Sequence, residues 1–223
     1  MRVARILTTI AFAALAVPAT ATAAGSVSAS VGTLGVGIQG AMPLGANANL
    51  RLGANFLSVS RRYTETSVDY DGNLKLRTVG LLLDYHPFGG GFRFTGGAYW
   101  NGTKATLHAQ PTGGTYTING NTYAASDIAN AEGRLDFRRI APYLGVGWGR
   151  HAGGQGGLYV AADLGVMFVD PRIAYDFTCG SAVPAATCNQ IRADVDAEKA
   201  RIDSDLGKFN AYPVATFSLG YRF

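Results

Sequence analysis

The chain has 223 residues, of which 48% are hydrophobic and 15% charged, and its formal net charge is +4 at pH 7. Two of the 19 basic residues, Arg2 and Arg5, lie in the first five positions, and without them the net charge falls to +2. This small balance excludes nucleic acid as a partner indicated by charge. After residue 23, no segment approaches the roughly 18 uninterrupted apolar residues of a membrane helix, so a membrane location has to come from strands.

The first 23 residues have the pattern of a secretory signal peptide. Arg2 and Arg5 precede an apolar run over residues 6–17 that is too short to span a bilayer, and small residues at 21–23 suit cleavage. An N-terminal anchor helix is the alternative, but Pro18 ends the run too early. The remainder, 24–223, contains no linker or shift in composition, so we expect one domain.

The first two predicted strands, 33–42 and 50–56, alternate apolar with small or polar residues, as strands with two different faces do. A short turn over 43–49 joins them. The alternation changes phase at Leu57, which predicts a β-bulge. A polar stretch over 61–73 then predicts a loop.

Two further strands are expected at 74–86 and 92–104, joined by a glycine-rich turn over 87–91. Leu82 is the exception to the alternation of the first of them. The long polar segment 105–133 predicts a loop that carries a small hairpin at 115–123, around Asn119 and Gly120.

The fifth strand, about 135–148, changes phase at Arg138 and Arg139, which predicts a second bulge. A turn over 150–156 leads to the clearest strand, 158–168. Residues 190–208 then carry apolar side chains at helical spacing, with Asn189 able to cap the start and Gly207 the end. We expect a short amphipathic helix that serves as a solvated connector, with a partner-binding helix as the alternative.

The last strand, 213–223, alternates strictly and ends on an aromatic residue. Its apolar face includes Phe217, Leu219, Tyr221 and Phe223, as expected of a strand that faces lipid and reaches the aromatic girdle. This pattern resembles the C-terminal assembly signal of bacterial outer-membrane proteins, and that resemblance implies recognition by the barrel-assembly machinery.

These seven spans predict an all-β fold, a transmembrane antiparallel up-and-down β-barrel with one short amphipathic helix before the last strand. Bacterial single-chain barrels have an even number of strands, so we expect eight. The missing span lies in 25–33, 113–125 or 171–178. The short turns 43–49, 87–91 and 150–156 are assigned to the periplasmic end.

The sequence indicates no catalytic, metal or cofactor site. His86, His108 and His151 fall in turns or loops without the spacing of a metal site or a catalytic triad, so we expect them to be exposed to solvent. Cys179 and Cys188 enclose a short segment just before the helix. In an oxidising compartment they predict a disulfide, with two free thiols or a metal site as alternatives.

Charged residues on the inner face of the predicted barrel form the candidate site. Arg51, Asp84 and Arg93 lie on the inner parity of three consecutive strands, at similar distances from turns, so one carboxylate could bridge two guanidinium groups. Asp163 and Arg222 share this parity but are expected too far around the barrel to join. The cluster is interpreted either as a gate or as a salt-bridge plug that fills a small barrel.

The segments "HPFGGGFRFTGG", "APYLGVGWG", "ADLGVMF" and the terminal "LGYRF" resemble the small OmpA-type/OmpW-type outer-membrane barrel families. The resemblance implies the bacterial outer membrane and contact with its lipids and lipopolysaccharide. We expect a structural or surface-interaction role without enzymatic activity, and a monomer is favoured over an oligomer. A narrow passive channel for small solutes is the main alternative, because glycine is frequent on the inner faces. A lipid A-modifying barrel enzyme is less favoured, because the sequence contains no His-x-Ser.

Overall fold

The computed structural model describes residues 25–65, 68–111, 114–152, 155–207 and 210–223. The predicted signal peptide, 1–23, lies outside the described residues.

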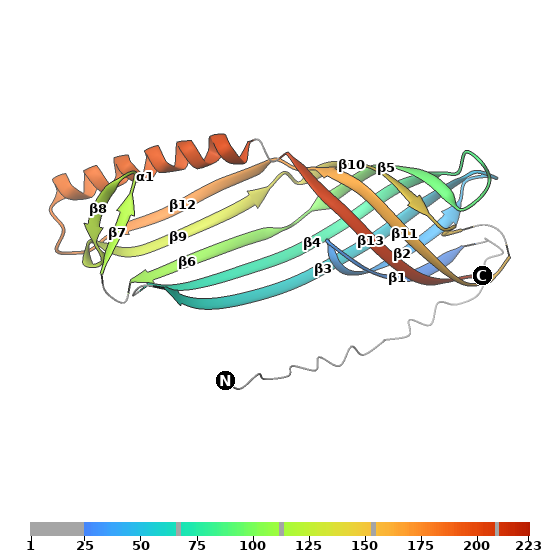
Figure 1. Ribbon diagram of the computed structural model, residues 1–223, viewed down its shortest axis with the longest axis horizontal. Helices are drawn as coiled ribbons and strands as arrows, with labels where there is room; N and C mark the ends of the chain where they lie inside the picture. The colour runs from blue at the N-terminus through green and yellow to red at the C-terminus, as the bar shows by residue number, and fades with distance from the viewer. Residues whose placement is uncertain (1–24, 66–67, 112–113, 153–154, 208–209) are drawn as a thin grey trace, which may run out of the picture.

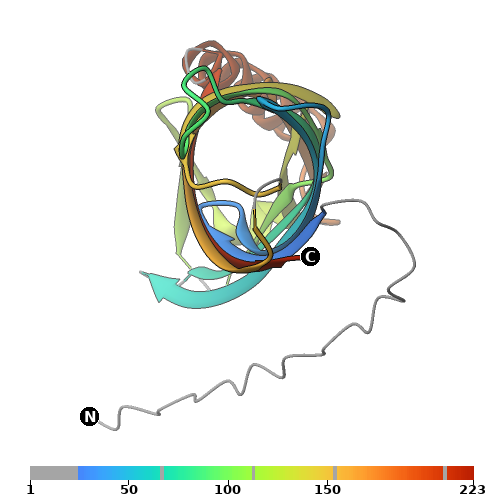
Figure 2. The same cartoon turned by 90° about the vertical axis from the view of Figure 1, so that its right-hand side faces the viewer.

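Eight antiparallel strands close into a ring, and this confirms the predicted barrel (Figure 2). In ring order they are β1 (Ser26–Gly32), β2 (Gly35–Pro43), β3 (Ala48–Glu65), β4 (Val68–Tyr85), β5 (Phe92–Asn101), β10 (Ile140–Trp148), β11 (Gly157–Phe168) and β13 (Ala211–Arg222). The ring closes where β1 pairs with β13, from Ser26 opposite Arg222 to Gly32 opposite Thr216. The missing span is therefore the first of the three candidates, 25–33, because β1 completes the ring.

One side of the barrel continues far beyond the ring (Figure 1). Three further strands lie next to β5, β10 and β11 in the sequence: β6 (Lys104–Pro111), β9 (Ile128–Phe137) and β12 (Pro171–Cys179). Together with the far parts of β4 and β3 they form a sheet in the order β12-β9-β6-β4-β3. We call this five-stranded extension the outer sheet. The loops predicted over 61–73 and 105–133 are therefore wrong over most of their length, since polar residues on one face hid strands.

A small hairpin and one helix cover the outer sheet (Figure 1). The hairpin consists of β7 (Thr115–Ile118) and β8 (Asn121–Ala124) and lies where the sequence predicts it; a short 3₁₀ turn, η1 (Ala125–Asp127), follows. The helix α1 (Ala185–Leu206) precedes the last strand, as predicted. It begins five residues before the predicted start, after Pro184 rather than at Asn189, and Gly207 ends it. The disulfide between Cys179 and Cys188 is confirmed and ties the end of β12 to α1.

The inner face of each long strand changes character where the barrel gives way to the outer sheet. Along β3, Arg51 and Asn55 face inward and are buried, whereas Leu52 and Phe56 face outward and are exposed. Further along the same strand Val59, on the inner parity, faces α1 in the outer sheet. The apolar side of the strand therefore moves from the outer to the inner face.

This exchange of faces, rather than a bulge, explains the phase change at Leu57. Leu57 pairs with Leu76 in a ladder that runs without a shift in register from Ala48 to Glu65. The predicted bulge is wrong because an apolar pattern reports which face is covered by an apolar medium, and that medium changes along the strand.

The second predicted bulge, at Arg138 and Arg139, has the same explanation. Phe137 and Tyr143 have the same inward parity on either side of it, so the alternation of side chains continues unbroken. Arg138 and Arg139 separate β9 from β10, and the pairing partners change there. Up to Phe137, in β9, the strand pairs with β6 and β12. In β10 it pairs with β5 from Ile140 onwards and with β11 from Tyr143 onwards.

The connections between ring strands over 44–47 and 86–91, and the described residues 149–152 and 155–156 between β10 and β11, all lie at the end of the barrel opposite the outer sheet. The C-terminus lies at the same end (Figure 1). The molecule thus has one end with compact connections and one end with a tall, helix-covered wall.

Candidate functional site

Four charged side chains meet inside the barrel and form what we call the lumen cluster: Arg51, Asp84, Arg93 and Asp163. None of the four is more than 4% exposed. Arg51 donates a hydrogen bond of 2.9 Å to Asp84, and the Arg93 Nε lies 3.6 Å from the same carboxylate oxygen. The three residues that the sequence places together are therefore in contact.

Asp163 is the member that the sequence argument placed too far around the barrel. It accepts two hydrogen bonds from Arg51, of 3.0 and 3.1 Å, and one of 2.7 Å from Arg93. The expectation of separation is wrong because it counted distance along the wall. In a narrow barrel, side chains on opposite strands meet through the centre.

Neutral groups supply further hydrogen bonds to the lumen cluster. Thr95 donates to Asp84 over 2.7 Å, Arg51 donates to the side-chain oxygen of Gln39 over 3.2 Å, and Arg93 donates to the carbonyl of Gly149. Two guanidinium groups and two carboxylates balance in charge. Such pairing is what keeps buried charges from a prohibitive desolvation cost.

Two histidines lie beside the cluster, contrary to the expectation that they are exposed. His86 and His151 are both 0% exposed, whereas the side chain of His108 is 40% exposed in the outer sheet. His151 lies 3.4 Å from an Arg51 nitrogen and 3.7 Å from Asp84. The prediction fails because residues 149–152, which follow β10, turn across the mouth of the barrel (Figure 2) and bring His151 to Arg51 and Asp84.

An apolar layer fills the lumen next to the outer sheet. Its buried members include Leu82, Tyr99, Tyr143 and Met167, and the two tyrosine rings pack edge to face with centroids 5.4 Å apart. Leu82, the exception in its strand's alternation, belongs to this layer. The interior therefore holds an ionic layer near the end with compact connections and an apolar layer near the outer sheet.

The inward glycines provide room for these side chains and do not widen a channel. A Cβ at Gly80 would overlap the Tyr99 ring, and a Cβ at Gly147 would come within 2.7 Å of the Arg93 guanidinium carbon. Small inner positions next to large ones are how a narrow barrel fills its taper. The frequent glycines on the inner faces therefore do not support a channel.

The remaining predicted residues lie at the barrel wall and its mouth. Arg222 packs its guanidinium 5.5 Å from the centre of the Tyr159 ring, and no contact with the lumen cluster is seen for it among the described residues. The four apolar residues of the last strand face outward and are each more than half exposed: Phe217, Leu219, Tyr221 and Phe223.

The outside of the ring is an apolar band. Large side chains on several strands are more than half exposed, among them Leu52, Phe56, Leu144, Leu164 and Leu219. A continuous apolar surface of this kind on a folded protein marks contact with a membrane or another protein. Within the described ranges, α1 and η1 are the helices, and neither is long and apolar enough to cross a membrane.

Among the residues that the structure describes, no group of three or more His, Cys, Asp or Glu side chains is arranged to hold a metal ion. The chemistry of the lumen cluster is that of paired, fully buried ions.

The fold and the site define a class: a small eight-stranded antiparallel barrel with a filled interior and a helix-covered sheet on one side. Among solved structures, those of CarO2 and CarO from Acinetobacter baumannii share this fold, with TM-scores of 0.55 and 0.54. Each is 18% identical to this chain and covers 90% of it, with 99% and 98% of their own chains matched. At this identity the likeness concerns the fold alone. No protein-family model and no curated protein matches the chain, so the OmpA-type or OmpW-type resemblance stays a prediction.

Proposed function

We propose that the protein is an integral barrel of the bacterial outer membrane with a structural or surface-interaction role and no enzymatic activity. The apolar outer band and the even number of ring strands support the location. The barrel-assembly machinery and the surrounding lipids and lipopolysaccharide are its partners, and it acts as a monomer. With the compact connections at the periplasmic end, the outer sheet and α1 extend from the cell surface.

One observation carries the proposed role: the lumen is closed by two layers of different chemistry. Solute would have to displace the lumen cluster, in which Arg51 and Arg93 are both held by Asp163, and then the packed rings of Tyr99 and Tyr143. An eight-stranded barrel has an interior just wide enough for side chains to fill. The protein is therefore expected to present a surface and not to conduct.

The absence of enzymatic activity is argued from the same interior. His86 and His151 follow β4 and β10 at the mouth of the barrel and are both 0% exposed, which supports the proposal because a buried side chain is not open to an acyl chain or a peptide. A general base has to come within hydrogen-bond reach of its substrate.

The test is single-channel conductance of the refolded protein in a planar bilayer, together with gel mobility before and after boiling. We expect a heat-modifiable barrel without measurable conductance. Phe223→Ala should slow assembly, because it removes the exposed aromatic side chain directly after β13, while the backbone bond from residue 223 to Gly25 is kept. Steady conductance of the wild-type protein would contradict the closed lumen, and identical mobility of boiled and unboiled protein would contradict the membrane barrel.

A narrow passive channel is the second candidate, in which the lumen cluster is a gate. The observation that favours it is incomplete pairing: one Asp84 oxygen and both His86 nitrogens are buried without a hydrogen-bond partner. Unpaired buried groups destabilise a closed arrangement and make a second arrangement accessible. Under this hypothesis, conductance appears when an acidic member of the cluster is removed.

A further inference from the structure

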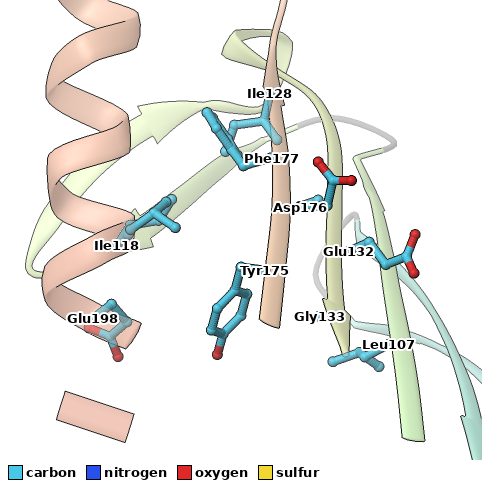
Figure 3. A pocket seen from close by; sticks show the side chains of 11 residues that line it. Leu107, Ile118, Ile128, Glu132, Gly133, Tyr175, Asp176, Phe177 and Glu198 are labelled. Atoms are coloured by element: carbon cyan, nitrogen blue, oxygen red, sulfur yellow. The ribbon is translucent and has the colours of Figure 1, made fainter. Parts of the chain in front are cut away.

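An apolar cavity lies between α1 and the concave face of the outer sheet (Figure 3). Its volume is about 260 Å³. Its walls come from separate elements: Leu107 of β6, Ile118 of the hairpin, Tyr175 and Phe177 of β12, and Val195 of α1. In Figure 3 the Tyr175 side chain stands between the helix and the strands of the sheet.

A second apolar cavity of about 690 Å³ adjoins the first beneath the later part of α1. The two share Leu107, Gly133 and Tyr175 as walls, and Ile202 and Leu206 cover the second from the helix side. Ligand pockets in proteins typically have volumes of about 300–1,000 Å³ and predominantly apolar linings. The two spaces together are of this kind.

The helix is held over these cavities by anchors that do not depend on filling them. The disulfide Cys179–Cys188 fixes its start to β12, and Asp194 accepts a hydrogen bond of 2.8 Å from Asn121 of the hairpin. The anchors set the separation between helix and sheet, so the apolar faces below need not close against each other. An apolar occupant would cover the apolar walls of both cavities and so stabilise the folded chain.

Gly133, in the wall shared by the two cavities, leaves room for a side chain. A Cβ at this position would meet its nearest neighbour, a Tyr175 ring carbon, at 3.6 Å, which is ordinary van der Waals contact. The backbone there does not require glycine for reasons of crowding. A large side chain at position 133 would extend into both cavities, since both are lined by this residue.

A polar hollow of about 310 Å³ opens next to the first cavity. It shares Tyr175, Phe177 and Val195 with that cavity, and α1 adds Arg192 and Lys199 together with the carboxylate of Asp196. An apolar space that passes directly into a hollow with both charge signs matches a molecule with a hydrocarbon part and a polar head.

We propose that the space between α1 and the outer sheet binds a single-chain amphiphile, with its hydrocarbon chain along Leu107 and Tyr175 and its polar head beside Arg192 and Lys199. The proposal rests on the proposed function only for the source of the ligand, the lipid leaflet next to the outer sheet.

The experiment uses the full mature chain in amphipol and palmitic acid with a photoactivatable diazirine at the end of its chain. After irradiation, tandem mass spectrometry locates the labelled residues. We expect label on the cavity walls, at Leu107, Phe177 or Val195. Gly133→Phe should reduce this labelling about tenfold, because the ring takes the place of the chain.

The matched control is Gly96→Phe. Gly96 faces outward on β5, where a Cβ would lie 3.6 Å from Leu144, so a ring there occupies lipid-facing space and should leave cavity labelling unchanged. Val195→Phe fills the cavity from the helix side and keeps the test decisive if Gly133→Phe does not fold.

Equal cavity labelling of wild type and both filling variants, or label confined to outward residues such as Leu144 and Leu219, would overturn the proposal. Boiled and unboiled samples run beside each other report the barrel separately. A heat-modifiable barrel without cavity label refutes the amphiphile site alone, whereas loss of heat modifiability in the wild type refutes the membrane barrel.

Discussion

Arg51 of β3 and Asp163 of β11 are joined by two hydrogen bonds, 3.0 and 3.1 Å long, across the full width of the barrel. β3 and β11 stand four places apart in the ring of eight and are therefore opposite each other. Because Arg93 also donates to Asp163, this carboxylate links three strands through the interior. These side-chain bonds through the centre hold β3, β5 and β11 in place relative to one another, in addition to the backbone hydrogen bonds between neighbouring strands.

The first prediction concerns the two acidic residues of the lumen cluster. Asp163→Ala removes the carboxylate that holds both arginines, so it should lower the free energy of unfolding by about 3–5 kcal/mol. Asp84→Ala leaves both arginines bound to Asp163 and should cost less, about 1–3 kcal/mol. Urea unfolding in lipid vesicles measures both.

Conductance of the same variants separates the two interpretations of the cluster. If it is a plug, Asp163→Ala stays closed, because the layer of Tyr99 and Tyr143 still fills the lumen. If it is a gate, the variant conducts with altered ion preference. Asp163→Asn, which keeps the shape, is the control. Wild-type stability together with wild-type conductance in Asp163→Ala would refute both interpretations.

The second prediction concerns the disulfide. Replacement of Cys179 and Cys188 by serine should release the start of α1 from β12 and lower the local stability of the outer sheet by about 2–3 kcal/mol. The eight-stranded ring, to which neither residue belongs, should keep its heat modifiability. Limited proteolysis should then cut the double variant between residues 180 and 190 faster than wild type. Equal cleavage rates would show that other contacts hold the helix.

The third prediction is a pH dependence centred on Asp194. The Tyr123 hydroxyl, and then the side-chain amides of Asn121 and Asn119, donate to its carboxylate and lower its pKa from 3.8 to about 2. A lowered folded pKa stabilises the hairpin against α1 at pH values above the ordinary pKa of Asp, about 3.9, and the effect is lost as the pH falls towards 2.

Hydrogen-exchange protection of the hairpin amides, corrected for intrinsic rates, measures this effect. Protection should be constant from pH 7 to about 5 and then decrease below pH 4. Asp194→Asn should show weaker protection at neutral pH and no acid step. A decrease of the same size in this variant would assign the acid sensitivity to another group.

The fourth prediction tests the packing of the inward glycines. Gly80→Ala puts a Cβ into the Tyr99 ring and should cost about 1–3 kcal/mol through overpacking. Gly96→Ala, on the outward face of the neighbouring strand, meets Leu144 at 3.6 Å and should be nearly neutral. Unfolding midpoints of the two variants give the comparison. If the lumen were an open channel, the two substitutions would have similar effects.

The sequence predicts the barrel well because one face of each ring strand forms the apolar outer band and the other lines a packed interior, which produces alternation. It predicts the outer sheet poorly for the same reason. There the outward residues are polar, as in the pair Ser60–Asn73, joined by a hydrogen bond of 2.6 Å, so the segment has the composition of a loop. Strand β1 could be predicted only as one of three candidates for the eighth span, because its inward residues, Ser26, Ser28 and Ser30, are small and polar.

For the candidate site, parity predicts which charges face inward, and Arg51, Asp84 and Arg93 are placed by that signal alone. Contact between opposite strands depends on barrel diameter, which a linear pattern does not contain, so Asp163 is missed. The burial of His151 is missed because the course of a connection after its strand ends follows from tertiary packing. One signal in the sequence could have placed Asp163 in the lumen cluster. It is the remaining carboxylate on the inner parity near a turn.

The exchange of apolar faces along the long strands has a consequence for assembly. A slip of one residue turns every side chain of a strand to the opposite face. In β3 such a slip would put Arg51 into the apolar outer band and, at the same time, turn Val59 away from α1. An incorrect register is therefore penalised in two different surroundings at once, so misaligned intermediates should be short-lived even though the glycine-rich ring strands alone would tolerate slippage.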